Sequence, residues 1–270
     1  MAKSKNKLKV YISVDMEGIT DVIHWNETNP GDDYNYYRML MTKEANAAIE
    51  GAMNAGATEI VVRDAHSSAR NIIPDLLNKK AKLIREWSGG PLSMMEGIDN
   101  TFDAVVFIGY HAKAMSQNAT LKHTMSGTIL DLKVNGISLP EAGWNGLIAG
   151  YFNVPVVFIS GDKAICEQSK NIFGNIYTLA VKEGIGDASI NLHPEVSREL
   201  IKKGVKNAIE NRSKIKPLKF KSPFTIEIQF KQESIANRLS YYPQAIRTGE
   251  YSVTYKNDNF YEIMRFFMFR

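Results

Sequence analysis

The chain has 270 residues, of which 44% are hydrophobic and 23% are charged, and its net charge at pH 7 is +4. This composition is typical of a globular protein, and the single cysteine excludes a disulfide framework. Four lysines within residues 1–9 account for the positive excess, because the other 29 basic residues balance 29 acidic ones. We therefore expect a basic tail over residues 1–9, no nucleic-acid partner, and no membrane association, since no apolar run approaches about 18 residues.

The elements predicted along the chain alternate between strands and helices. Apolar, β-prone runs predict strands over residues 8–15, 58–66, 103–111 and 154–162. Helices are expected over residues 34–56, 140–153 and 193–215, and Asn135-Gly136 predicts a hairpin within 128–139. This order is typical of an α/β fold with a mostly parallel sheet flanked by helices.

A change in composition near residues 213–223 predicts a boundary, because this stretch is basic and contains two prolines. We expect an α/β metal-binding catalytic domain over residues 10–215. The segment 216–270 contains the strand-like runs "FTIEIQF" and "EYSVTY" and the apolar, helix-like run "FYEIMRFFMF". We expect it to form a smaller C-terminal α+β region.

Polar side chains with ligand chemistry follow all four predicted strands. They are Asp15, Glu17, Asp64, His66, His111 and Asp162. Parallel strands have their carboxyl ends at one edge of the sheet, where ligands bind in open α/β folds. Each residue alone is explained by a turn, a helix cap or a structural hydrogen bond. Their joint occurrence at the same end of the strands favours a shared site.

The spacing of Asp15 and Glu17 indicates a cation. Residues i and i+2 of a strand point to the same side, where two carboxylates repel each other unless a cation or a proton lies between them. Imidazole nitrogen together with carboxylate oxygen suits zinc and related metals, and one carboxylate can bridge two metals. Glu141 opens a predicted helix, and His123 lies in a predicted loop, so the pattern alone assigns neither to the site. His24 and His193 are expected to be a loop residue and a helix-start residue.

Two other interpretations stay open at this point. "DMEGIT" is similar to the D-x-D-G-x-T motif of haloacid-dehalogenase-like phosphatases, although these enzymes have no use for histidines at strand ends. A non-catalytic metal-binding or peptide-binding protein is the other alternative.

Several motifs, taken in order, resemble the zinc-dependent D-aminopeptidase family associated with a dipeptide-transport operon. They are "SVDMEGI", "DAHSS", "GYHAKA", "KHTMSG" and "PEAGWNGLIAGYFNVPVVFISGD". The resemblance runs from about Val10 to Asp162 and continues weakly through the rest of the chain. It implies a hydrolase that removes N-terminal D-amino acids from short peptides. The single cysteine and the lack of an apolar signal-peptide segment or membrane span lead us to expect a cytoplasmic protein.

The resemblance also implies roles for individual residues. The ligands of two zinc ions per subunit would be Asp15, Glu17, His66, His111 and Glu141, with Asp15 bridging the two ions. His123 would be the catalytic histidine, and Asp162 would have a supporting role. The implied reaction is hydrolysis by a water activated at the two-zinc site, in a homo-oligomer that forms a ring-like decamer.

Overall fold

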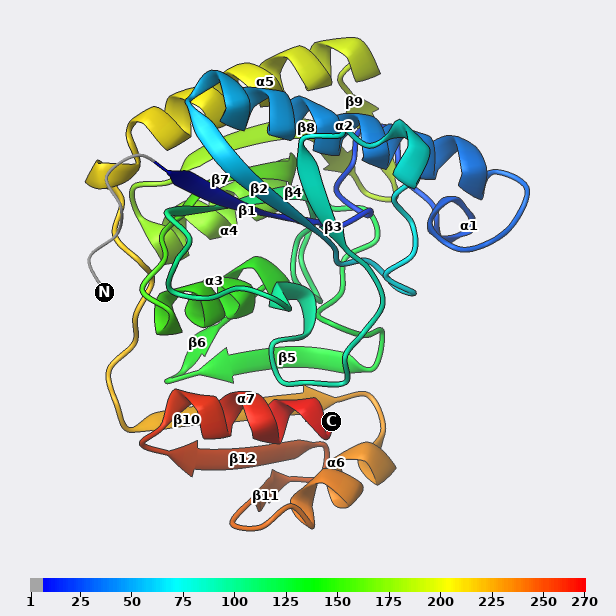
Figure 1. Cartoon of the computed structure of the whole chain (residues 1–270). Coiled ribbons are helices and arrows are strands. Elements are labelled where there is room, and N and C mark those ends of the chain that lie inside the picture. Colours follow the sequence, from blue (N-terminus) through cyan, green and yellow to red (C-terminus); the bar gives the residue numbers. More distant parts are fainter. Residues whose placement is uncertain (1–6) are drawn as a thin grey trace.

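The computed structural model describes residues 7–270 and confirms the expected α/β fold, with a seven-stranded sheet at its centre (Figure 1). The strand order is β3-β2-β1-β4-β7-β8-β9, and all neighbours are parallel except β8 and β9. These strands are β1 (Leu8–Val14), β2 (Ala57–Asp64), β3 (Ala81–Ile84), β4 (Ala104–Tyr110), β7 (Val156–Asp162), β8 (Tyr177–Ile185) and β9 (Ala188–Asn191).

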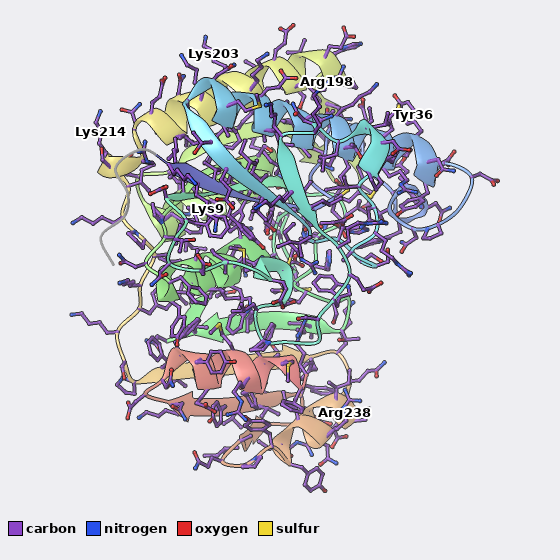
Figure 2. All side chains as sticks on the ribbon, in the orientation of Figure 1. Lys9, Tyr36, Arg198, Lys203, Lys214 and Arg238 are labelled. Atoms are coloured by element: carbon purple, nitrogen blue, oxygen red, sulfur yellow. The ribbon has the colours of Figure 1, made fainter. Side chains whose placement is uncertain are left out.

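Helices cover the parallel sheet, and both of its faces are buried. α2 (Tyr34–Asn54) and α5 (Pro194–Glu210) pack side by side on one face, and α4 (Lys163–Phe173) follows β7 (Figure 1). The labelled Arg198 and Lys203 extend from the outer side of α5 (Figure 2). Along β1, Ile12 faces the core beneath α2 and α5 and Tyr11 faces the opposite core. The central strands β1, β4 and β7 are therefore buried along almost their whole length, as is usual for a parallel sheet.

A second sheet of five antiparallel strands lies below the first (Figure 1). Its order is β11-β12-β10-β5-β6, formed by β5 (Ile129–Val134), β6 (Ile137–Ser138), β10 (Phe224–Phe230), β11 (Ile246–Gly249) and β12 (Ser252–Asn257). The predicted hairpin is confirmed as β5–β6, and Asn135 and Gly136 both have positive φ, as a tight hairpin turn requires. β5 also pairs with β10, so the hairpin and the C-terminal strands form one sheet.

α3 (Glu141–Tyr151) lies between the two sheets, and α7 (Phe260–Met268) packs against β10 and β12 of the second sheet (Figure 1). Apolar residues of both helices join one core cluster. Trp144 of α3 contacts Phe267 of α7, with ring centroids 4.4 Å apart. Smaller elements complete the fold: α1 (Trp25–Thr28), α6 (Glu233–Ser240), and the 3-10 turns η1 (Pro74–Leu76), η2 (Ser93–Met95) and η3 (Arg212–Lys214). Across residues 7–270, we find no helix with the length and apolar character needed to cross a membrane.

Candidate metal centre

Five of the predicted ligands lie together at one edge of the parallel sheet. β1 lies between β2 and β4, so the residues that follow these three strands are neighbours in space. They are joined by Glu141, the first residue of α3. All five side chains are buried, with at most 5% of any residue exposed: Asp15, Glu17, His66, His111 and Glu141.

These side chains form two three-residue groups that share Asp15. In the first group, His66 Nδ1 lies 2.9 Å from Glu17 Oε2 and 3.4 Å from Asp15 Oδ1. In the second, His111 Nε2 lies 3.5 Å from Asp15 Oδ2 and 3.4 Å from Glu141 Oε1. The ligand-type atoms of each group lie within 4.8 Å of one another. Each group therefore offers oxygen and nitrogen donors around one point, the donor chemistry that zinc accepts.

Backbone carbonyls hold the imidazole rings so that one nitrogen of each faces the carboxylates. His66 Nε2 donates to the carbonyl of Thr28 at 2.9 Å, and His111 Nδ1 donates to the carbonyl of Ala112 at 3.0 Å. The opposite nitrogens, Nδ1 of His66 and Nε2 of His111, are then available as ligands.

Two buried polar atoms at the centre of the cluster have no hydrogen-bond partner within residues 7–270. They are Oδ2 of Asp15 and Nε2 of His111, which both belong to the second group and lie 3.5 Å apart. Leaving a buried acceptor unsatisfied costs about 1–3 kcal/mol, and a cation that accepts both lone pairs would remove that cost. The residues present therefore fit a metal ion.

The electrostatics of the cluster also favour added positive charge. Burial and the charge of Glu17 raise the pKa of Asp15 well above its ordinary value. Burial favours the neutral forms of Glu17 and Glu141. The charge of His66 nevertheless holds the pKa of Glu17 below its ordinary range, and the charge of His111 does the same for Glu141. Burial opposes charge on His111, but Glu141 raises the pKa of that imidazole to about 10. Asp15 and the two imidazoles therefore hold protons more tightly than usual where no cation is bound, and a metal ion can replace those protons.

His123 completes the cluster from the loop that precedes β5. Its Nδ1 donates to the carbonyl of Leu121 at 2.9 Å, so Nε2 faces Glu141 Oε1 at 3.4 Å and Glu17 Oε1 at 3.7 Å. The ring stacks on that of His111, with centroids 4.2 Å apart and planes 8° apart. Its side chain is 15% exposed, whereas the five other side chains are at most 5% exposed. His123 is therefore the member of the cluster with most access to a ligand.

The cluster opens into a cavity of about 450 Å³. This volume lies in the usual range for small-molecule sites. Its walls are formed by residues far apart in the sequence and include Trp25, Trp87, Met94, Met125 and Arg270. The edge of the Trp25 ring meets the His123 ring, with centroids 5.3 Å apart.

Close backbone contact brings the ligand-bearing loops together. The carbonyl oxygen of Tyr110, directly before His111, would lie 1.8 Å from a Cβ added to Gly18 and 1.8 Å from one added to Gly161. Gly18 also donates from its backbone N–H to the carbonyl of Gly109 at 2.7 Å. Glycine is needed at residue 18 because the neighbouring backbone lies too close for a side chain; its φ is outside the left-handed region.

Sequence patterns gave no indication of two buried charged residues behind the cluster. Lys182 of β8 donates from Nζ to the backbone carbonyls of Glu17 and Val22. Glu44 of α2 accepts the backbone N–H of Thr20 at 3.2 Å and the hydroxyl of Ser197 at 2.8 Å. Both therefore fix the loop that carries the ligands after β1.

Two carboxylates at strand ends have structural roles. Asp64 accepts the backbone N–H groups of Asn71 and Ile72 at 2.6 and 2.7 Å. Asp162 caps α4 by accepting the backbone N–H of Ile165 and also accepts that of Ala112, the residue after His111.

The two histidines left out of the site lie at the beginnings of helices. His24 caps α1 through Nδ1, which accepts the backbone N–H of Asn26 at 3.2 Å. His193 caps α5 in the same way, accepting from Glu195 at 3.3 Å.

Comparisons with known proteins find similar sequences and a similar structure. The model of the peptidase M55 family, described as D-aminopeptidase, matches residues 8–269. A D-aminopeptidase of Bacillus subtilis (strain 168) is 34% identical over 254 residues, which cover 92% of this chain and 91% of that protein. A similar solved structure is described as "Zn-dependent D-aminopeptidase DppA from Bacillus subtilis, a self-compartmentalizing protease". It has a TM-score of 0.92 and 32% identity, and the match covers 97% of this chain and 96% of that one.

Proposed function

Because the chain belongs to the peptidase M55 family of D-aminopeptidases, we propose that it is a metal-dependent aminopeptidase that removes N-terminal D-amino acids from short peptides. One observation carries this proposal: five buried carboxylate and imidazole side chains form two groups that share Asp15. Family membership favours this function over a haloacid-dehalogenase-like phosphatase, which would leave His66 and His111 unexplained.

The proposed cofactor is zinc, with two ions per subunit. Asp15, Glu17 and His66 would hold one ion, and His111 and Glu141 would hold the other together with Asp15 as the bridging ligand. The zinc dependence of the similar solved structure and the donor set of this chain support the choice of metal. When bound, zinc supplies Lewis acidity, which polarises a carbonyl group and lowers the pKa of water towards neutrality.

His123 is the proposed catalytic residue. Its Nδ1–H is held by the carbonyl of Leu121, so a proton can be taken up and released only at Nε2, the atom nearest the carboxylates. The ring lines the cavity, where Nε2 can donate a proton to the leaving amine of the peptide. Stacking against His111 and edge contact with Trp25 hold the ring in this orientation.

Metal content tests the shared role of Asp15. Asp15→Asn removes a ligand from both groups, whereas Glu141→Gln removes a ligand from one group only. We expect about two zinc ions per unmodified chain, close to none for Asp15→Asn and about one for Glu141→Gln, measured by elemental analysis after dialysis. Equal metal content in the three proteins would contradict the shared carboxylate.

A panel of short peptides that begin with D- or L-residues tests the activity. We expect the zinc-loaded chain to release the first residue of D-peptides and to lose this activity with a chelator. Tight zinc binding without hydrolysis of any member of the panel would instead support a non-catalytic metal-binding or peptide-binding protein.

The proposed assembly is a ring-like decamer in the cytoplasm, with the cavities facing an enclosed space. The description of the similar solved structure as a self-compartmentalizing protease supports a closed oligomer. Light scattering coupled to size-exclusion chromatography measures the mass of the assembly. A monomer at the concentration used for activity assays would contradict the proposed decamer.

A further inference from the structure

Arg270 contributes a positive charge to the wall of the cavity that holds the metal centre. It follows α7, which packs against β10 and β12 of the second sheet (Figure 1). Arg270 lines the same cavity as Glu17, His123 and Glu141. Among the residues of 7–270 that line this cavity, Arg270 is the only lysine or arginine. The rest of the charged lining consists of the proposed ligands, so this cation needs a separate explanation.

The guanidinium group of Arg270 is positioned by Phe267. Nη1 donates to the carbonyl of Phe267 at 3.1 Å, and the central carbon of the guanidinium group lies 4.1 Å from the centre of the Phe267 ring. This contact with an aromatic face stabilises the cation and holds its plane. The side chain is only partly exposed, so its position is set by the protein and not by free solvent.

Most of the hydrogen-bonding capacity of Arg270 is unused by the protein. A guanidinium group has five N–H donors, and one of them bonds within the described part of the chain. No carboxylate of residues 7–270 lies within 4.0 Å of it, whereas Arg247 and Arg265 pair with Glu233 and Glu262 at 2.6 and 3.0 Å. Within residues 7–270, Arg270 is thus a cation without an ion-pair partner, and it lines a cavity.

The group keeps its charge at neutral pH. Burial lowers the pKa of Arg270 to about 10, and the charge of Glu141 opposes this effect. Glu141 attracts Arg270 through space but does not contact it, and Oε1 of Glu141 lies 3.4 Å from Nε2 of both His111 and His123.

We propose that Arg270 binds the free carboxylate of a short peptide whose amino-terminal peptide bond lies at the metal centre. This inference rests on the proposed function and specifies its substrate class: peptides short enough to end inside the cavity. The planar fork of arginine matches a carboxylate with two parallel hydrogen bonds. A longer peptide, or one with an amidated end, does not present a carboxylate at this position and loses that interaction.

Paired substrates test the proposal. D-alanyl-glycine has a free carboxylate, and D-alanyl-glycinamide is the same dipeptide without it. Arg270→Met removes the positive charge, whereas Arg270→Lys keeps the charge but lacks the two parallel N–H donors of the guanidinium group. The matched control is Arg265→Met, because Arg265 of α7 is exposed and already pairs with Glu262. Circular dichroism and zinc content verify that each variant is folded and loaded.

We expect Arg270→Met to lower kcat/KM for D-alanyl-glycine by roughly 10- to 100-fold, mainly through KM, because hydrogen bonds to a charged group are lost. Arg270→Lys should have an intermediate effect. The change for D-alanyl-glycinamide should be much smaller in both variants, and Arg265→Met should match the unmodified chain on both substrates.

Two results would overturn the role of Arg270 alone: equal losses on the free and amidated dipeptides, or no loss on either, while the unmodified chain cleaves both. An unmodified, zinc-loaded chain that cleaves neither dipeptide nor any longer D-peptide would overturn the proposed function, and the carboxylate site would fall with it.

Discussion

Replacing Gly18 by alanine tests whether close backbone contact assembles the metal centre. A Cβ at this position would lie 1.8 Å from the carbonyl oxygen of Tyr110, and carbon atoms of real side chains essentially never come nearer than 3.0 Å. The end of β1 or the end of β4 must therefore move by at least 1.2 Å, the difference between those two distances. The three atoms nearest to the added Cβ all belong to the backbone of Gly109 and Tyr110, so no flexible side chain can move aside.

This displacement would move the proposed metal ligands. Tyr110 precedes His111, and Gly18 follows Glu17, so the shift separates groups whose nitrogen and oxygen atoms now lie 3.4–3.5 Å apart. Overpacking of this kind costs about 1–3 kcal/mol, or roughly 2–12 °C in Tm for a chain of this size. A misplacement of about 1 Å also lowers turnover on the order of 100-fold.

Calorimetry, zinc content and kcat/KM on a D-peptide measure these effects. Gly31→Ala is the control, because the nearest atom to its added Cβ would be 3.8 Å away. We expect the control to match the unmodified chain. If Gly18→Ala kept Tm, zinc content and activity, the close contact would not be needed to hold the ligands, and the reasoning would be refuted.

Three further substitutions separate catalysis, pH-dependent stability and loop support. His123→Ala should lower kcat by about 10²–10⁴-fold while zinc content is unchanged, and near-normal turnover would contradict its role. Burial raises the pKa of Glu44 from 4.5 to about 7 in the folded chain. As the pH rises from about 4.5 to 7, Glu44 therefore loses its proton in the unfolded chain before it does so in the folded chain, and the free energy of unfolding decreases. Glu44→Gln should abolish this pH-dependent decrease, which amounts to up to about 3 kcal/mol in the free energy of unfolding, measured by urea unfolding at pH 5 and pH 8. Lys182→Met leaves the carbonyls of Glu17 and Val22 without their donor and should lower the free energy of unfolding by about 1–3 kcal/mol, also by urea unfolding.

The sequence predicted that the proposed ligands meet at one edge of the sheet, because strand direction decides at which edge they lie. A parallel sheet puts the carboxyl ends of its strands at one edge, so Asp15, His66 and His111 could be expected to meet without knowledge of the strand order. Their grouping around Asp15 depends on β1 lying between β2 and β4, which no local pattern encodes.

Long-range partners escaped prediction for the same reason. β5 forms a tight hairpin with β6, which Asn135-Gly136 predicts, but its other neighbour is β10, about ninety residues further along the chain. Lys182 lies in a strand with an irregular burial pattern, and its partner Glu17 is 165 residues away. Pairings at such distances depend on how the elements pack and not on the local residue pattern.

Hydrogen-bond saturation separates Asp15 from the structural aspartates at the same edge of the sheet. Asp64 and Asp162 also follow apolar strands, yet each uses both oxygens to accept N–H groups, and most of these donors belong to the backbone. Asp15 accepts one backbone N–H through Oδ1 and keeps Oδ2 without a partner in the described chain. A buried acceptor that the protein leaves open is costly unless a ligand fills it. The "SVDMEG" segment therefore offers an open acceptor to the proposed cation, while the aspartates of "VVRDAH" and "ISGDKA" hold the surrounding backbone in place.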